Sequence, residues 1–243
     1  MRKLIATAVL LIVATPPPLF SGPPFLTDDP EPVGFHHWEF YVSSIQTFSR
    51  AETDATLPHI EINYGIVPAV QLHLILPMEY VSQGGLSNYG FSDTEFGVKY
   101  RFIDETADMP QVGTFPLVEI PTANTSQNLG NGAVQFYLPL WIQKSWEKFT
   151  TYGGGGWWYN AGIEKKNWLF LGWEAQYDLS RKLTLGGEAY FHTATDEGGR
   201  SDAGFNIGGI LNFDQTNHIL FSIGHNVLDI GTFTGYIGYQ MTI

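Results

Sequence analysis

Long stretches in which apolar and polar residues alternate constrain the fold of this chain more than any other sequence feature. In the segment 70–76, Val70, Leu72, Leu74 and Leu76 share one apolar side. A repeat of two residues is that of a β-strand with two different faces, whereas an amphipathic helix repeats every 3.6 residues. No segment of the sequence has a convincing helical repeat, so the sequence predicts an all-β protein.

The same alternation predicts about twelve strands, most of them long. The expected strands are 36–48, 56–65, 70–81, 92–103, 111–121, 133–145, 150–160, 167–179, 183–192, 202–212, 218–224 and 232–243. Most exceed the roughly 5–6 residues common in globular proteins and approach the roughly 9–11 residues that cross a bilayer on a tilt.

The expected connections fall into two classes that alternate along the chain. Short links lie at 65–69, 144–149, 179–182 and 213–217, with a somewhat longer one at 104–110, and longer loops lie at 49–55, 82–91, 122–132 and 193–201. This layout is typical of an outer-membrane barrel with both termini on the periplasmic side. The sequence therefore predicts a transmembrane, antiparallel, up-and-down β-barrel of about 12 strands.

The charge content separates this barrel from a secreted β-sandwich, which has the same alternation. Only 15% of the residues are charged, against roughly 25% in soluble domains, and a sandwich would expose a polar face to water. Asp and Glu number 24 against 12 Lys and Arg, a balance that argues against a nucleic-acid partner. Cysteine is absent, which excludes disulfides, thiolate metal sites and a lipidated cysteine.

Three segments follow from the sequence. Residues 1–22 carry Arg2 and Lys3 before an apolar run and are expected to be a removable signal peptide. Residues 23–35, rich in Pro and acidic residues, are expected to form an irregular periplasmic lead-in, here called the lead-in, because each Pro lacks a backbone donor. Residues 36–243 are expected to form the barrel, located in the cell outer membrane.

The apolar side of each strand is expected to contact outer-membrane lipid, because polar groups facing hydrocarbon are costly. Expected lipid-facing residues are Leu72, Leu74, Leu76, Val98, Phe136, Leu138, Ile207 and Met241. Expected interfacial aromatic residues are Trp38, Tyr80, Tyr100, Trp146, Trp157, Trp158 and Trp168. The last strand keeps one apolar face to Ile243, and such closing strands carry the signal read by the barrel-assembly machinery.

Polar residues on the opposite side of the strands are expected to line the lumen, together with aromatic residues. The candidates are Glu39, Tyr41, Glu61, Glu79, Glu95, Lys99, Arg101, Glu119, Tyr137, Trp141, Glu174, Glu188, Tyr190 and Tyr236. They predict an acidic, aromatic passage for small solutes, without a cofactor. The alternative is a closed barrel, either because the Glu residues pair with Lys99 and Arg101 or because the lead-in folds back into the lumen.

Two other kinds of site are weaker hypotheses. Some outer-membrane barrels modify lipids, and His192 with Glu188 and Ser201 is the nearest match to such an active site. His36 and His37, with acidic residues before them, could bind a metal only if the strand bends, since neighbouring strand residues point oppositely. A lipid-modifying enzyme and a metal site are therefore both disfavoured.

Several segments resemble the family of outer-membrane barrels named for the meta-pathway of phenol degradation. They are 28–32 (Asp-Asp-Pro-Glu-Pro), 92–102 (Ser-Asp-Thr-Glu-Phe-Gly-Val-Lys-Tyr-Arg-Phe), 120–122 with 129–132, and 153–155. The chain departs from the usual family pattern at 89–93 and at Ala123. The resemblance covers nearly all of the chain after residue 22, and it implies a barrel that passes small, often aromatic, compounds.

Overall fold

A computed structural model describes residues 23–228 and 231–243, and it consists mainly of long antiparallel strands. The expected signal peptide, residues 1–22, lies outside the described residues. The strands are β1 Trp38–Phe48, β2 Glu52–Val67, β3 Val70–Gln83, β4 Leu86–Phe91, β5 Thr94–Ile103, β6 Gln111–Thr114, β7 Leu117–Ile120, β8 Gln135–Trp146, β9 Phe149–Asn160, β10 Trp168–Ser180, β11 Leu183–His192, β12 Asp202–Asn212, β13 Asn217–Asn226 and β14 Phe233–Thr242. One 3₁₀ turn, η1, spans Thr125–Gln127.

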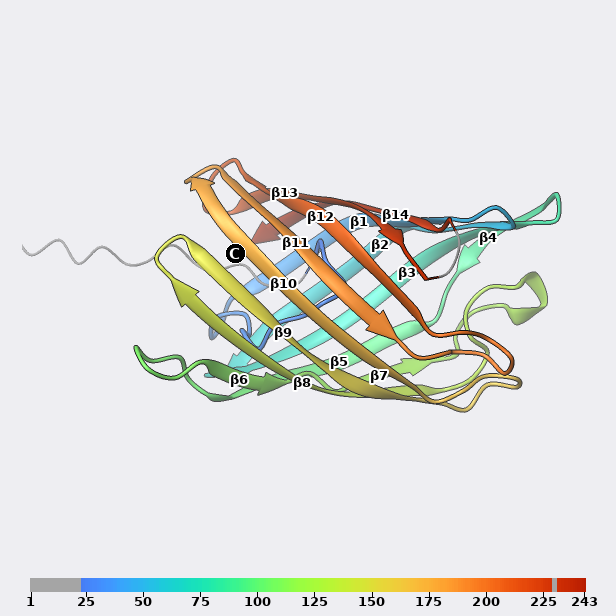
Figure 1. Cartoon of the computed structure of the whole chain (residues 1–243), viewed down its shortest axis with the longest axis horizontal. Coiled ribbons are helices and arrows are strands. Elements are labelled where there is room, and N and C mark those ends of the chain that lie inside the picture. The colour runs from blue at the N-terminus through green and yellow to red at the C-terminus, as the bar shows by residue number, and fades with distance from the viewer. Residues whose placement is uncertain (1–22, 229–230) are drawn as a thin grey trace, which may run out of the picture.

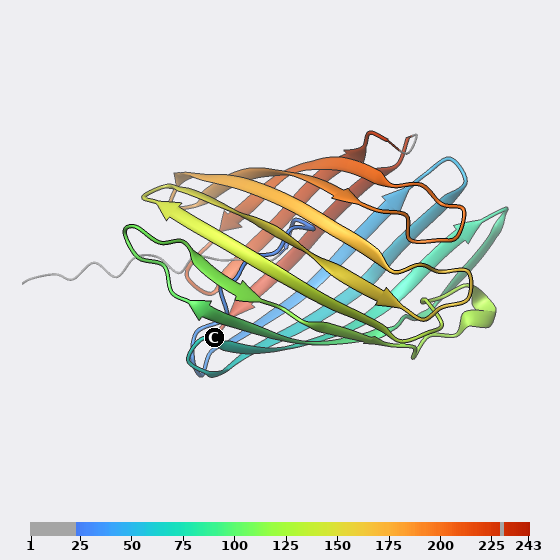
Figure 2. The same ribbon diagram turned by 60° about the horizontal axis from the view of Figure 1, so that its bottom comes forward.

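The sheet closes on itself, because β1 pairs with β14 from Glu39↔Thr242 to Phe48↔Phe233. The other strands pair with their neighbours along the chain, except that β4 does not pair with β5 and β6 does not pair with β7 (Figure 1). Strands β4 and β5 lie end to end beside β3, so that together they count as one strand of the wall. Strands β6 and β7 likewise lie end to end between β5 and β8. The described residues therefore form a closed antiparallel barrel of 12 strands, which confirms the predicted fold class. Figure 2 shows the tilted strands around the lumen.

The expected loops 49–55 and 82–91 are wrong, because the strands on either side extend beyond the residues in which apolar and polar side chains alternate. β2 begins at Glu52 rather than at residue 56, and β3 reaches Gln83 before a two-residue turn leads into β4. Several of the added residues, such as Glu52, Asp54 and Asn88, are polar, and the large apolar residues of β4 are exposed. A hairpin that projects into water on both faces needs no apolar side, so the pattern that marks the rest of the strands is missing there.

Prolines coincide with the irregular places in the wall. Pro58 lies in the register shift between Thr56 and His59. Pro116 separates β6 from β7, and Pro139 lies in the part of β8 between its pairings with those two strands. Because proline has no N–H to donate, the ladder is interrupted where these residues occur.

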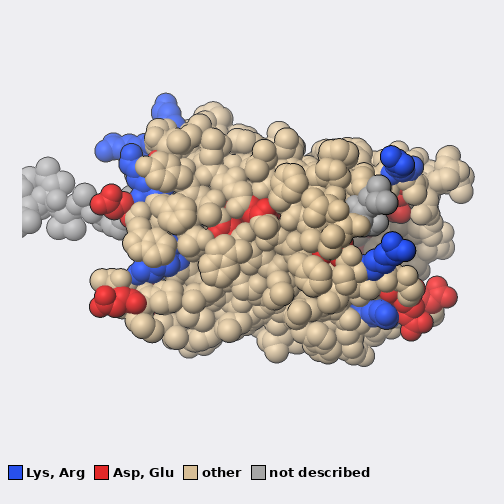
Figure 3. All heavy atoms as spheres, in the orientation of Figure 1, with Lys and Arg blue, Asp and Glu red and all other residues tan. Residues whose placement is uncertain are grey.

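The outer surface of the wall is apolar. The eight residues expected to face lipid are exposed or half-exposed, and six of them are exposed by 40% or more of their surface. On the face shown in Figure 3, Lys and Arg residues lie at the two ends of the barrel, whereas a few acidic atoms also show between other side chains midway along it. No helix of the described residues is long and apolar enough to span a membrane.

Two buried clusters fill part of the interior. One contains Phe115, Tyr137, Trp141, Phe170 and Tyr190, and the other contains Tyr41, Ile210 and Leu220. The first cluster lies on the wall formed by β6 to β11, and it provides the aromatic part of the site described below.

Candidate functional site

The fourteen residues proposed for the lumen all lie on the inner side of the wall. Eight are buried, namely Tyr41, Glu61, Lys99, Tyr137, Trp141, Glu174, Glu188 and Tyr190. The other six are half-buried, namely Glu39, Glu79, Glu95, Arg101, Glu119 and Tyr236. The structure also brings several of them together across neighbouring strands: Tyr41 is opposite Glu61, Glu95 opposite Glu119, and Glu174 opposite Glu188. Their role in passing a solute stays a prediction.

Aromatic side chains form a continuous track along one side of the lumen. From the end of the barrel with the long loops, Trp168 stacks on Trp158 at 5.4 Å and Trp158 on Tyr137 at 4.6 Å between ring centroids. Tyr137 then meets Trp141, and Trp141 meets Phe170. Each such pair contributes roughly 0.5–1.5 kcal/mol beyond its buried area. The track gives planar or apolar solutes a continuous surface.

Two of the track residues correct an expectation from the sequence. Trp158 and Trp168 were expected in an interfacial girdle, but they pack against the buried aromatic cluster. They occupy even-numbered positions of β9 and β10, as do Tyr152 and Phe170, which are buried. The strand alternation therefore decides their side of the wall, and it overrides the tendency of Trp to lie at membrane interfaces.

Glycines in β9 make room for the track. A Cβ atom on Gly154 would lie 3.1 Å from the ring of Trp141, and one on Gly156 would lie 2.6 Å from the ring of Tyr137. Gly154 also has a φ of +149°, which favours glycine. The glycines of the segment 153–156 thus allow the backbone of β9 to lie close to these rings.

The lead-in lies inside the barrel, where Figure 2 shows it as a blue segment enclosed by the strands. The N–H groups of Leu26 and Thr27 donate to the two carboxylate oxygens of Glu188 at 2.8 and 2.7 Å. Val33 N–H donates to Gln71, and Ser222 donates to the carbonyl of Pro24. Of the arrangements left open by the sequence, the structure therefore has the one in which the lead-in folds back into the lumen.

Wall glycines allow this close fit of the lead-in. A Cβ atom on Gly172 would meet Thr27, one on Gly113 would meet Pro30, and one on Gly65 would meet the Gly34 carbonyl. Gly65, Gly113 and Gly172 come from three different parts of the wall. The lead-in is thus seated on several sides of the lumen at once.

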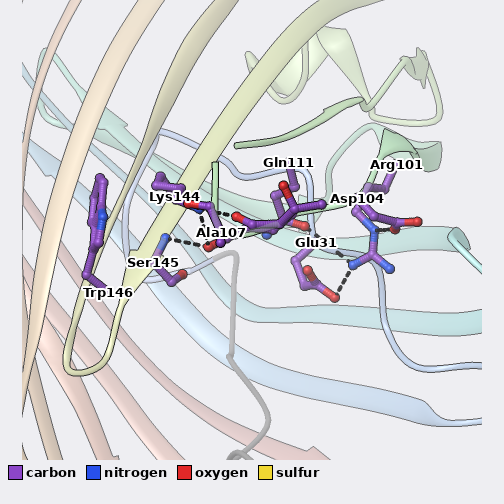
Figure 4. A pocket seen from close by; sticks show the side chains of 10 residues that line it. Glu31, Arg101, Asp104, Ala107, Gln111, Lys144, Ser145 and Trp146 are labelled. Carbon is purple, nitrogen blue, oxygen red and sulfur yellow. Dashed lines mark hydrogen bonds and ion pairs between the residues drawn. The ribbon is translucent and has the colours of Figure 1, made fainter. Parts of the chain in front are cut away.

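The two lumen cations pair with the lead-in rather than with wall carboxylates. Lys99, which is 2% exposed, lies 2.8 Å from Asp28 and 3.7 Å from Asp29. Arg101 lies 2.5 Å from Glu31 and 2.9 Å from Asp104 (Figure 4). The expected alternative in which wall Glu residues pair with these cations is therefore wrong for the principal contacts. The lead-in brings its own carboxylates into the lumen, where Asp28 and Glu31 form the shortest ion pairs with Lys99 and Arg101.

The buried side chain of His73 and its partners, which lie beside Lys99, were not singled out from the sequence. His73 Nδ1 lies 2.6 Å from Asn63, and its Nε2 lies 3.0 Å from Glu95. Phe115 contacts the edge of the His73 ring and lies under the Lys99 ammonium at 4.9 Å. His73 could have been found, because it occupies an inward-facing position on β3. Phe115 lies between β6 and β7, where the alternation of a regular strand is interrupted.

The loop between β7 and β8 packs against residues of β3 and against the start of β5, at the end of the barrel with the long loops. Asp93 accepts hydrogen bonds from the N–H groups of Ala123 and Asn131, and Glu79 accepts one from Gly130. Leu129, from the same loop, is fully buried. The segments 92–102, 120–122 and 129–132, which carry the family resemblance, thus meet in one structural unit at this end.

Two pockets flank the lumen. A polar pocket of about 590 Å³ lies at the end with the short turns, between Glu31, Arg101, Lys144 and Trp146 (Figure 4). A second pocket of about 580 Å³ lies beside the interruption of β6 and β7, and its lining is almost wholly apolar. That lining includes outward-facing Leu72 and Val98 and also His73 from the inner side.

The residues considered for lipid chemistry are not assembled. His192 contacts Trp168 and the Thr193 carbonyl. Glu188 binds the lead-in and Asn206, and Ser201 is exposed in the loop between β11 and β12. No interaction among the described residues joins the three.

The comparison with protein families decides the relationship of this chain. The family described as "Putative MetA-pathway of phenol degradation" matches residues 32–236. The chain belongs to this family. No curated protein matches the chain in sequence.

Solved structures similar to this member of the phenol-degradation family are outer-membrane barrels. The COG4313 outer membrane channel from Pseudomonas putida F1 has a TM-score of 0.72 at 14% identity, covering 88% of this chain and 98% of that one. The NanC porin has a TM-score of 0.60 at 8% identity, and the KdgM porin 0.57 at 10%, each covering 83% of this chain and 98% of its own. At these identities the likeness establishes the fold.

Proposed function

We propose that the protein lies in the outer membrane and passes small solutes with an aromatic or apolar part through its lumen, and that the lead-in closes this route. The observation that carries the proposal is the aromatic track, which runs from Trp168 to Phe170 and meets the lead-in beside Gly172. The apolar pocket beside β6 and β7 offers a further surface for such solutes on the lipid side. The family description and the channels and porins of similar fold support a role in transport.

A reversible lock on the lead-in tests this function. Because the chain has no cysteine, a Thr27→Cys/Gly172→Cys variant places its only two thiols at positions where a Cβ on residue 172 would touch Thr27. The oxidised protein, reconstituted in liposomes, should admit no phenol, and reduction should restore entry. Each single cysteine variant serves as a control for the substitution itself.

The outcome separates passage from a purely structural role. Equal uptake by the oxidised and reduced forms would show that the lead-in is not the closing element. Absence of uptake by the reduced form and by the parent chain would favour a structural barrel instead. The separate placement of His192, Glu188 and Ser201 supports a passage rather than an enzyme.

A further inference from the structure

Glu174 is a fully buried carboxylate for which the described residues provide no hydrogen-bond donor. Its exposed fraction is 0%, and both carboxylate oxygens lack a hydrogen-bond partner among the described residues. A Cβ atom on Gly186 would meet its Oε1 atom, so the wall beside it is already close-packed. A buried carboxylate without a donor loses its hydration without compensation, which is costly.

Glu188, directly opposite on β11, has the donors that Glu174 lacks. Its two oxygens receive the N–H groups of Leu26 and Thr27, one each, and Asn206 donates to Oε1 at 2.5 Å. Two parallel N–H donors on the two oxygens of one carboxylate are the arrangement by which a guanidinium or amidinium group binds a carboxylate. The backbone of the lead-in thus occupies the place that a guanidinium or amidinium group would take on Glu188.

The surroundings of the two carboxylates also fit a planar cation. Phe170 and Tyr190 lie on the same two strands, with ring centroids 6.4 Å apart and planes 18° apart. The ring of Trp141 contacts Phe170 at 6.3 Å between ring centroids and extends this aromatic surface. Aromatic faces attract cations, most strongly where water is excluded.

We propose that Glu174 and Glu188 form a binding site for a planar organic cation of the amidinium or guanidinium class, which competes with the lead-in for Glu188. The inference rests on the proposed function and names one substrate class for it. The cation donates to Glu188 in place of Leu26 and Thr27, supplies Glu174 with its missing donor, and places its apolar part against Phe170 and Tyr190.

The alternatives fit less well. No group of three His, Asp or Glu side chains suited to a metal ion occurs in the part of the chain that the structure describes. An anion would need Lys99 or Arg101, which are already bound to Asp28 and Glu31. Two neighbouring acidic groups repel an anion and attract a cation.

Three ligands of nearly the same shape test the charge requirement: benzamidine as the cation, benzamide as the neutral form and benzoate as the anion. Calorimetric titration of the purified full chain in zwitterionic detergent should show benzamidine binding at least ten-fold more tightly than either of the others. Glu174→Gln should remove most of this preference. Benzamide or benzoate binding as tightly as benzamidine would overturn the proposal.

A matched variant separates a site from the general attraction of an acidic lumen. Glu119→Gln removes the same charge from a half-buried position on β7, outside the proposed site, where Gln135 already donates to the carboxylate. It should change benzamidine affinity by less than two-fold, whereas Glu174→Gln should lower it ten-fold or more. Equal losses in both variants would mean that only the overall charge of the lumen attracts the cation.

Competition with the lead-in has its own measurement. In the Thr27→Cys/Gly172→Cys chain, benzamidine should slow formation of the disulfide at least three-fold, and benzamide should not. An unchanged rate would refute displacement of the lead-in. If benzamide, benzoate and phenol enter liposomes but the site does not bind benzamidine more tightly than benzamide or benzoate, the inference fails and the proposed function stands. If the reduced chain admits none of these solutes, the proposed function itself fails.

Discussion

At the scale of single residues, the position of the lead-in depends most on Lys99. Its ammonium is buried, and it holds Asp28 and Asp29 while lying over the ring of Phe115. Lys99→Met should free the lead-in, because removing one partner of a buried ion pair costs about 3–5 kcal/mol. The amides of Leu26, Thr27 and Val33, which are hydrogen-bonded to the wall, should then exchange at least ten-fold faster, as followed by hydrogen–deuterium exchange and mass spectrometry.

A matched change at the surface controls for this result. Lys148→Met removes an exposed lysine from the turn between β8 and β9, and it should leave the exchange rates of the lead-in amides unchanged. Unaltered protection of these amides in Lys99→Met would show that the contacts of Glu188, Gln71 and Ser222 hold the lead-in without the ion pair.

At the scale of elements, the two faces of β3 should tolerate charge differently. Leu74 faces outward, whereas His73 lies inside between Asn63 and Glu95. Leu74→Arg should impair assembly by roughly 2–4 kcal/mol, the cost of Arg at the middle of a lipid-facing strand. His73→Arg keeps its charge beside carboxylates and should assemble better. The heat-induced gel shift of the folded barrel measures both, and similar folded fractions would contradict the assignment of the faces.

Two loops at the end of the barrel with the long loops are joined by a salt bridge and a backbone hydrogen bond, here called the clasp, which should depend on pH. Lys165 lies 2.5 Å from Asp196, and the N–H of Lys166 donates to the Thr195 carbonyl. The hydrogen bond from Lys165 holds the pKa of Asp196 below its ordinary 3.8. The clasp is therefore fully stabilised above pH 3.8 and weakens as the pH falls through the lowered pKa.

Amide exchange of Lys166 measures the clasp. Corrected for the intrinsic exchange rate, its protection should fall between pH 5 and pH 2.5, and Lys165→Met should already show the low value at pH 5. Equal protection of this amide at both pH values in the parent chain would exclude the carboxylate as its cause. The effect is expected to be small, since both side chains are exposed.

Most of the wall was predictable from alternation alone, and the contents of the lumen were not. The period of two fixed the inner side for Tyr137, Trp141 and Glu188, because a strand has only two faces. It did not mark the polar hairpin of β2, β3 and β4, where both faces are in water. The lead-in has neither a period nor a hydrophobic face, and its partners on Glu188 and Ser222 lie more than 160 residues away. Its position follows from tertiary contacts that no local pattern records.

At the scale of the whole molecule, the charge balance should set ion selectivity. The chain carries a formal charge of −12, and the carboxylates proposed for the lumen outnumber Lys99 and Arg101. Fixed negative charge in a narrow channel concentrates cations and repels anions. Ions that pass the reconstituted barrel should therefore be mainly cations, as a reversal potential in a potassium chloride gradient will show. An anion-selective current would contradict the acidic lumen.

The attachment of the lead-in to β1 sets how strongly any solute must bind to replace it. Val33, which is held by Gln71, is only a few residues from Trp38, where β1 begins. A segment on so short a tether is present at its own site at an effective concentration in the millimolar range. Dilution of the protein does not remove the lead-in from its site. A free solute replaces it only if the solute is more concentrated than this effective concentration or binds more tightly than the lead-in. We therefore expect the barrel to open where the local concentration of solute is high and to stay closed where the concentration is low.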